Sequence, residues 1–352
     1  MRKFLSFILF VILLGCLFLM PFLSSHISTA SKDAIKIITE ELIPSLFPFI
    51  FLSSLVTSWG SSLLSFIFAP LLCPLFKISK NAVPCIISGF LGGFPSGAKT
   101  ASVLYKEKKI TKREAERLPL IANNAGFMFV VGVLGVGCFG SFNAGIVLYL
   151  FHIFPSVIMG LFTKGDAADS ENKNASAAPD FNFFPSVFAA SLKDSVFTMG
   201  IIAGNFIIFS LLSSLLSLLF GESPLFPFAA GLIEVTGGVL SLPKTRTGLI
   251  TASFLLSFNG LSVHMQSLSF FAPLKLSMKK CFSGKIFSAF LSALLMDLTL
   301  PQNFPVKGGL PPMFFYISSF LIPLLFLIKK GGCKLHPPGI SHHVKKILLG
   351  KA

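Results

Sequence analysis

The segment at residues 92–100, GGFPSGAKT, carries residue types that can bind a phosphate group. In a phosphate-binding loop, two glycines separated by four residues let backbone N–H groups approach an anion, and a lysine directly after the second glycine neutralises it. Here Ala98 separates Gly97 from Lys99, and Pro95 removes one N–H group from the loop. No strand pattern precedes the segment. The spacing therefore disfavours an ATP-binding loop.

A re-entrant helical hairpin explains these residues better. Glycine permits a sharp chain reversal, and Pro95 can begin the helix that follows it. Ser96, Gly97 and the next N–H groups would then face a cavity at the positive end of that helix, which attracts anions. Lys99 would either add a full charge to this site or extend its amine to the membrane interface. Both roles of Lys99 stay open.

Polar side chains also interrupt other apolar segments at corresponding positions. Polar groups inside membrane spans are costly, and they often mark substrate or ion pathways, although helix–helix hydrogen bonding is the alternative. His264 could donate a hydrogen bond or carry a proton, and Glu234 could bind a coupling cation or be protonated. We expect a substrate site without catalytic or metal-binding residues. Its remaining candidate residues are Asn123, Asn124, Gly126, Glu234, Thr236, Asn259, Ser262, His264 and Gln266.

The composition predicts an all-α polytopic membrane protein. Of the 352 residues, 53% are hydrophobic and only 12% are charged, with a mean hydropathy of +0.82. A soluble fold of this length could not hide so much apolar surface. The net charge of +15 comes from residues in short loops between apolar runs, so it indicates membrane topology and not nucleic-acid binding. The six cysteines form no C-x-x-C pair, which favours buried thiols over a metal site.

Apolar runs and polar breaks divide the chain into two halves joined by a linker. The first apolar run, residues 4–23, predicts a membrane helix, with a signal peptide as the alternative. The predicted divisions are an N-terminal membrane helix and loop (1–33), a first repeat (34–163, hairpin 82–104), a polar linker with an amphipathic segment (164–195), a second repeat (196–328, hairpin 224–242) and a basic cytoplasmic tail (329–352).

The two halves repeat one order of elements: a span, a broken hairpin, a polar break, an interrupted span and an intact span. Lysine and arginine at residues 105–117 and in the loop at 275–285 predict that both segments are cytoplasmic. Counting spans then places the break at 244–247 on the opposite side, so the hairpins would enter from opposite faces. Paired interrupted segments of this kind are typical of inverted-repeat transporters. We therefore expect a transporter-like bundle with two re-entrant hairpins and interrupted helices.

Several segments together resemble the sporulation integral membrane protein YlbJ family, also called the stage V sporulation protein SpoVV family. They are PSLFPF (44–49), GFLGGFPSGAKTASVLYKEKKITKREAERL (89–118), NNAGFMFVVGVLGVGCFG (123–140) and ASFLLSFNGLSVHMQSLSF (252–270). That family belongs to the wider nucleoside-recognition, or Gate, group, which is similar to concentrative nucleoside transporters. The resemblance implies a membrane protein of endospore-forming bacteria that moves dipicolinic acid across the outer forespore membrane.

The sequence thus predicts a secondary transporter of a small organic anion, with dipicolinic acid as the expected substrate. We expect no enzymatic activity, no cofactor and no nucleic-acid partner, and the lipid bilayer as its surroundings. The coupling ion, H+ or Na+, stays open, and so does assembly into a homo-oligomer. A nucleoside transporter of the same fold and a non-transporting structural or assembly protein of the spore membrane are the alternatives.

Overall fold

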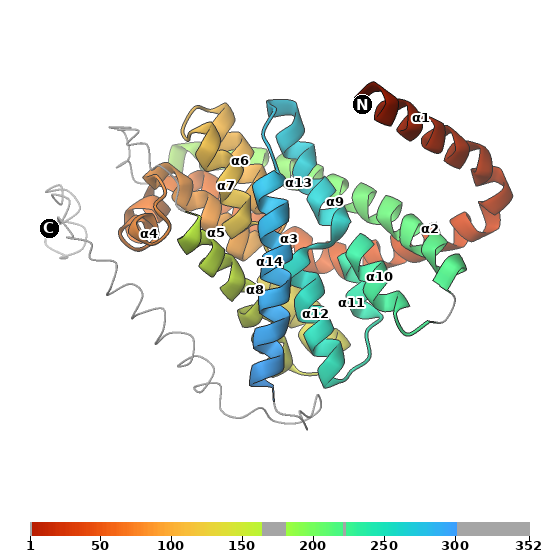
Figure 1. The fold of residues 1–352 in the computed structure, drawn as a ribbon. Helices are drawn as coiled ribbons and strands as arrows, with labels where there is room; N and C mark the ends of the chain where they lie inside the picture. Colours follow the sequence, from red (N-terminus) through yellow and green to blue (C-terminus); the bar gives the residue numbers. More distant parts are fainter. Residues whose placement is uncertain (1, 164–180, 221–222, 301–352) are drawn as a thin grey trace, which may run out of the picture.

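The computed structural model describes residues 2–163, 181–220 and 223–300 (Figure 1). All regular elements within these ranges are helical. The α-helices are α1 (Arg2–Leu19), α2 (Ser24–Ile37), α3 (Ile43–Trp59), α4 (Ser61–Phe76), α5 (Val83–Gly92), α6 (Ser96–Lys106), α7 (Lys112–Ala122), α8 (Phe142–Phe162), α9 (Phe184–Phe220), α10 (Phe226–Ile233), α11 (Val235–Leu240), α12 (Arg246–Phe258), α13 (Gly260–Phe271) and α14 (Lys279–Thr299). π-Helical segments η2 (Ile38–Leu42) and η4 (Met128–Cys138) and short 3-10 turns connect several of them.

Five helical segments of the described chain are long and apolar enough to cross a membrane. A sixth is possible if α4 and the bent segment that continues into α5 form one broken span. These segments confirm the predicted all-helical, polytopic class. The five are Leu17–Trp59, Phe142–Phe162, Phe184–Leu218, Arg246–Leu274 and Lys279–Thr299.

The N-terminal helices project from the main bundle (Figure 1). Phe10, Leu17 and Phe18 on α1 are exposed, which suits a helix surrounded by lipid. The chain stays helical through η1 (Met20–Leu23) and α2. The expected loop before residue 34 is therefore wrong, because the polar residues of this segment lie on a helix.

In the first half, α5 and α6 form a helix pair joined by a three-residue turn. Gly93 in this turn has a φ of 71°, a conformation that glycine adopts without strain. Within the pair, Ser88 Oγ lies 2.8 Å from Thr100 Oγ1. The next helix, α7, ends at Ala122, and the chain is non-helical until η4 begins. The hairpin predicted at 82–104 is thus a helix pair, and the break predicted near Asn123 is present.

The second half also contains a helix pair and an interrupted helix. Helices α10 and α11 form a pair whose turn is Glu234, and α12 and α13 are one helix interrupted at Asn259. Helix α14 then packs along α12 and α8. Asn259 has a φ of 77°, a left-handed conformation that Asn tolerates better than most residues.

The two basic connections lie at the same end of the bundle (Figure 1). The backbone N–H of Ser277 donates to Oε1 of Glu116 at 2.9 Å, which ties the α13–α14 connection to α7. At the other end, Arg246 forms an ion pair with Asp297 at 2.7 Å. This agrees with the charge pattern, which predicts that residues 105–117 and 275–285 share one side and residues 244–247 lie on the other.

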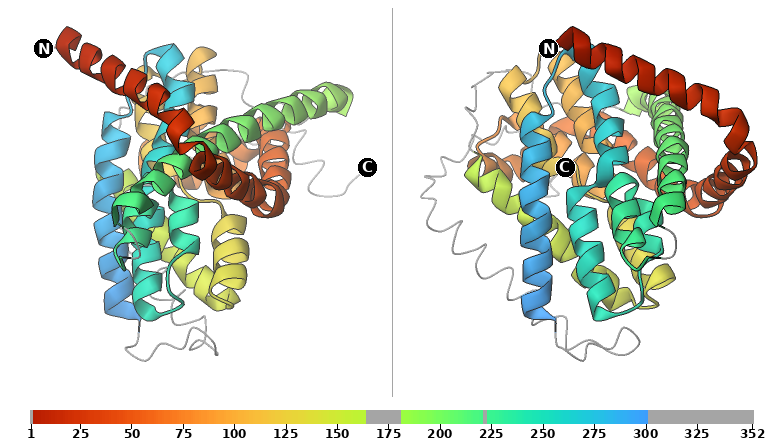
Figure 2. Two further views of the ribbon diagram at one scale, coloured as in Figure 1. Left: turned by 90° about the vertical axis from the view of Figure 1, so that its right-hand side faces the viewer. Right: turned by 45° about the vertical axis from the view of Figure 1, so that its right-hand side comes forward.

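Helices α3 and α9 pack against each other and cross the upright helices α12 and α14 (Figures 1 and 2). Helix α9 is continuous over 37 residues, so the predicted boundary between the amphipathic segment and the second repeat, at residues 195 and 196, falls inside one helix. Most of the predicted linker, the end of the predicted second repeat after residue 300 and the predicted tail lie outside the described residues.

Candidate functional site

The tip of the first helix pair packs directly on the break of the first interrupted helix. A Cβ atom built on Gly93 would lie 2.4 Å from the backbone nitrogen of Gly126, closer than real side-chain atoms approach. Only glycine therefore allows this backbone-to-backbone contact. The contact fixes the turn of the first pair against the segment that carries Asn123 and Asn124.

The second half contains the equivalent contact. A Cβ atom on Gly260 would lie 3.1 Å from both the Gly231 oxygen and the Val235 nitrogen. Glu234 sits in the turn of this pair, where its carboxylate accepts from the N–H groups of Thr236 at 3.0 Å and Gly237 at 2.6 Å. It caps the N-terminus of α11, which satisfies N–H groups that have no partner inside the helix.

The two helix breaks are bonded to each other. The side-chain amide of Asn259 donates to the backbone oxygen of Asn123 at 2.9 Å. The side-chain amide of Asn123 in turn donates to Oγ of Ser267 on α13 at 2.9 Å. Both asparagines are fully buried. The breaks of the two halves thus form one hydrogen-bonded centre inside the bundle.

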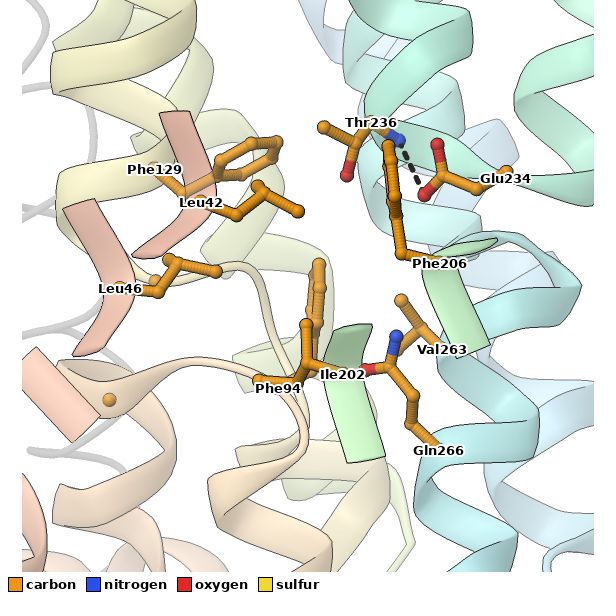
Figure 3. A pocket seen from close by; sticks show the side chains of 12 residues that line it. Leu42, Leu46, Phe94, Phe129, Ile202, Phe206, Glu234, Thr236, Val263 and Gln266 are labelled. Carbon is orange, nitrogen blue, oxygen red and sulfur yellow. Dashed lines mark hydrogen bonds between the residues drawn. The ribbon is translucent and has the colours of Figure 1, made fainter. Parts of the chain in front are cut away.

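A small cavity of about 20 Å³ lies between the two tips (Figure 3). It has room for about one water molecule, and Gln266 borders it with a buried side-chain oxygen that has no hydrogen-bond partner among the described residues. Figure 3 shows aromatic and aliphatic side chains on its other sides. The lining residues are Leu42, Leu46, Gly92, Phe94, Gly126, Phe129, Ile202, Phe206, Glu234, Thr236, Val263 and Gln266.

Asn124 points away from this cavity and binds a buried lysine. Its Oδ1 accepts from Lys285 Nζ at 2.7 Å and from Ser156 Oγ at 2.7 Å, and Lys285 Nζ also lies 3.1 Å from Ser156 Oγ. Lys285 is fully buried in α14, and within the described ranges no carboxylate forms an ion pair with it. The assignment of Lys285 to an exposed basic loop is wrong, because α14 begins at Lys279.

Two histidines stabilise the breaks. The N–H of Ala125 donates to Nε2 of His152 at 2.7 Å, and Nδ1 of His152 lies 3.2 Å from Ser257 Oγ. Since Nε2 accepts, the proton of a neutral His152 is on Nδ1 and points to Ser257. In α13, Nε2 of His264 lies 2.9 Å from the Phe258 oxygen and bridges the second break.

Lys99 does not face the small cavity. Its amine forms an ion pair with Asp194 on α9 and donates to Thr198 Oγ1 at 2.9 Å. Lys99 and Ser96 line a separate, larger cleft of about 340 Å³ between α3, α6 and α9. The amine is therefore held inside the protein, and the alternative of an amine extended freely to the interface does not apply.

The structure gathers the predicted residues into three groups. Gly126, Glu234, Thr236 and Gln266 border the small cavity, and Ser96 and Lys99 border the cleft. Asn123 and Asn259 connect the breaks, and Asn124 binds Lys285. Buried Gly97 receives Cys85 Sγ on its oxygen within the first pair, and Ser262 is buried one turn before Gln266. The sequence interpretation missed Asp194, Lys285 and Ser156. The charged side chain of Asp194 next to a long apolar run was the available signal.

No cluster of three or more His, Cys, Asp or Glu side chains in the described ranges is placed to hold a metal ion. The polar centre instead consists of amide, hydroxyl, lysine and backbone groups. Such groups bind small polar ligands through hydrogen bonds and charge.

Comparison with known proteins adds one relative. The chain is 26% identical over 315 residues to the sporulation integral membrane protein YlbJ of Bacillus subtilis (strain 168), with 76% of each chain covered. No protein-family model matches the chain, and no solved structure matches it. The resemblance to the YlbJ family that the motifs indicate is confirmed. Together with the candidate spans, it identifies a multi-pass membrane protein.

Proposed function

We propose that this relative of a sporulation integral membrane protein is a secondary transporter of a small organic anion. The expected substrate is dipicolinic acid, moved across the outer forespore membrane of a spore-forming bacterium. The proposal assigns the protein no enzymatic reaction. Its relative supports the link to sporulation, and the transport role depends on the geometry of the bundle.

The observation that carries the proposal is that the tips of both helix pairs and both interrupted helices border one cavity. Gly92 and Gly126 come from the first half, whereas Glu234 and Gln266 come from the second. The first pair leads away from the cavity toward the end that carries residues 105–117, and the second pair leads to the opposite end. This arrangement supports an inverted repeat with two re-entrant hairpins, in which the halves alternately expose a central site.

Buried positive groups support an anionic cargo. Lys285 lies at the first helix break without a carboxylate partner in the described chain, and Lys99 lies at the start of α6, the positive end of that helix. A dianion that approaches the centre would supply the negative charge that the first break lacks, whereas Lys99 is already paired with Asp194. This favours an aromatic dicarboxylate over a neutral ligand.

One observation favours the second candidate, a nucleoside-like ligand. The side-chain oxygens of Asn123, Asn259 and Gln266 are buried and have no hydrogen-bond partner in the described chain. Amide oxygens accept hydrogen bonds, so they suit a ligand with O–H or N–H groups. A dicarboxylate would satisfy them only through a protonated carboxyl group or a water molecule.

Uptake into proteoliposomes separates these candidates. The purified protein would be tested with labelled dipicolinate and labelled uridine, together with Gln266→Leu and the exposed control Ser269→Ala on the same helix. Because the Gln266 oxygen has no partner to lose, the Leu variant should fold normally and lose transport, while the control transports like the natural protein.

The outcomes differ for each candidate. Saturable dipicolinate uptake that Gln266→Leu abolishes would support the proposal. Uptake of uridine would support the transport role and would show that the substrate is a nucleoside and not dipicolinate. Uptake of neither compound, combined with normal sporulation of a strain carrying Gln266→Leu, would favour the structural or assembly role.

A further inference from the structure

The cleft between α3, α6 and α9 is large enough for a small ligand. Its volume of about 340 Å³ falls within the range of roughly 300–1,000 Å³ that small-molecule sites occupy. The cavity at the tips, by contrast, has about 20 Å³. Of these two spaces, the cleft has room for an aromatic dicarboxylate and the cavity at the tips does not.

Hydroxyl groups line the cleft, and two of them have no hydrogen-bond partner in the described chain. Ser53 on α3 and Ser191 on α9 are both more than nine-tenths buried, yet their Oγ atoms have no hydrogen-bond partner in the described chain. Unpaired buried hydroxyls are costly, so such groups commonly bind a water or a ligand. The remaining hydroxyl residues of the lining are Ser54, Thr57, Ser58, Ser61, Ser88, Ser96 and Thr100.

The ion pair in the wall of the cleft is asymmetric. The side chain of Lys99 is 11% exposed, whereas that of its partner Asp194 is 40% exposed. Lys99 also donates to Thr198, and Asp194 also accepts from Ser54 Oγ at 3.1 Å, but the more exposed carboxylate of Asp194 can turn toward water. A carboxylate that enters the cleft can therefore replace Asp194 on the Lys99 amine.

Gly92 separates the cleft from the cavity at the tips. It borders the small cavity, and a Cβ atom on it would lie 2.9 Å from Ser96 Oγ and 3.0 Å from Ser53 Oγ, both of which line the cleft. At this point the backbone of Gly92 is what separates the cleft from the cavity. A small movement of the first tip would join the two spaces.

The far side of the cleft reaches the charged connection between α6 and α7. Glu107 and Lys109 border it there, and they form an exposed ion pair with each other at 2.8 Å. Because these charges cancel, Lys99 is the positive group of the cleft that a substrate carboxylate can reach once Asp194 turns away. The opening lies at the end that the charge pattern predicts to be cytoplasmic.

We infer that this cleft is the access vestibule of the transporter, in which a carboxylate of the substrate exchanges with Asp194 on Lys99 before passing Gly92 to the centre. The inference rests on the proposed transport function. It assigns Lys99 and Asp194 opposite roles, since Lys99 attracts the anion and Asp194 competes with it.

Dipicolinate binding tests this assignment without transport. The chain contains a single tryptophan, Trp59, near the end of α3 beside the cleft-lining Ser58 and Ser61, so its fluorescence can report occupancy of the cleft in detergent. Lys99→Gln should weaken binding about tenfold, as expected for the loss of a charge-assisted contact, and Asp194→Asn should strengthen it severalfold. The double variant should bind like Lys99→Gln.

A purely structural ion pair predicts the opposite pattern. Both single variants would then weaken binding and lower the unfolding temperature, and the double variant would recover both properties, which would overturn the inference. Ser191→Met provides a second test, because it fills the cleft without breaking a hydrogen bond. It should abolish binding in a protein that unfolds at the natural temperature, and unchanged binding would contradict the vestibule.

The failure of either proposal can be recognised separately. If the wild-type protein transports no dipicolinate but shows the opposite effects of the two variants on binding, the anion site stands and the transport function fails. If uptake is saturable but its half-saturating concentration is the same in all four variants, the transporter stands and the vestibule is wrong.

Discussion

The side-chain amide nitrogen of Asn259 lies 2.9 Å from the backbone oxygen of Asn123, so the interrupted helix of one half is bonded to that of the other. The two residues are 136 positions apart in sequence. Because Asn259 also has a φ of 77°, one residue provides both the left-handed break and the bond across the halves.

These two roles can be separated by substitution. Asn259→Gly and Asn259→Ala both remove the hydrogen bond to Asn123, but only Ala is strained at a positive φ. We expect the Ala variant to be less stable than the Gly variant by about 1 kcal/mol. Thermal unfolding in detergent, followed by tryptophan fluorescence, measures the difference. Equal midpoints would show that the left-handed conformation carries no cost there.

Gly93 should tolerate no side chain. A Cβ atom on it would collide with the Gly126 nitrogen, and its φ of 71° adds backbone strain. We expect Gly93→Ala to destabilise the protein by about 2 kcal/mol or more. Gly204→Ala on α9 is the matched control, since nothing lies within 4 Å of its added Cβ, and it should be neutral or stabilising. Similar expression and unfolding of both variants would contradict the contact between tip and break.

Lys285 should be dispensable for folding. Burying an ammonium group without a carboxylate is costly, and Lys285→Met removes that charge while Asn124 keeps its bond from Ser156. We expect Lys285→Met to unfold at the natural temperature or above it and to lose dipicolinate uptake. The exposed Lys280→Met on the same helix should change neither property. A marked loss of stability in Lys285→Met alone would show that its hydrogen bonds outweigh the burial cost.

Glu234 should contribute to stability and to the site. Its carboxylate caps α11, so Glu234→Ala should cost about 1 kcal/mol. Thr111→Ala removes the side-chain cap of α7, far from the cavity, and should cost a similar amount. Uptake per folded molecule should fall only in Glu234→Ala. Equal uptake by both variants would exclude Glu234 from the transport site.

The sequence predicts the interruptions well because their causes are local. Gly92, Gly93 and Pro95 cannot continue a helix through the first turn, and Asn259-Gly260 breaks the second interrupted helix wherever it is placed. The N-terminal cap of α7 is equally local, since the Thr111 hydroxyl accepts from the Glu114 N–H at 3.2 Å. Each feature depends on residues within one or two turns.

The sequence interpretation could not predict ion pairs and hydrogen bonds between residues that are far apart in the chain. Lys99 and Asp194 are 95 residues apart, and Lys285 and Asn124 are 161 residues apart, so no spacing rule connects them. Positive charge near a span predicts a cytoplasmic loop, and this rule misplaced Lys285, which packing carries into the bundle. The same limit explains why the sequence leaves two roles of Lys99 open and does not predict its contact with α9.

The small volume between the tips has a thermodynamic consequence for every measured affinity. A space of about 20 Å³ must widen before it admits any solute larger than water, so the observed dissociation constant includes the free energy of that widening. Substitutions that weaken the contacts between the tips and the helix breaks would then lower the apparent dissociation constant without changing any residue that contacts the ligand. The apparent affinity would therefore depend on the free energy needed to separate the two halves as well as on the contacts between the protein and its substrate.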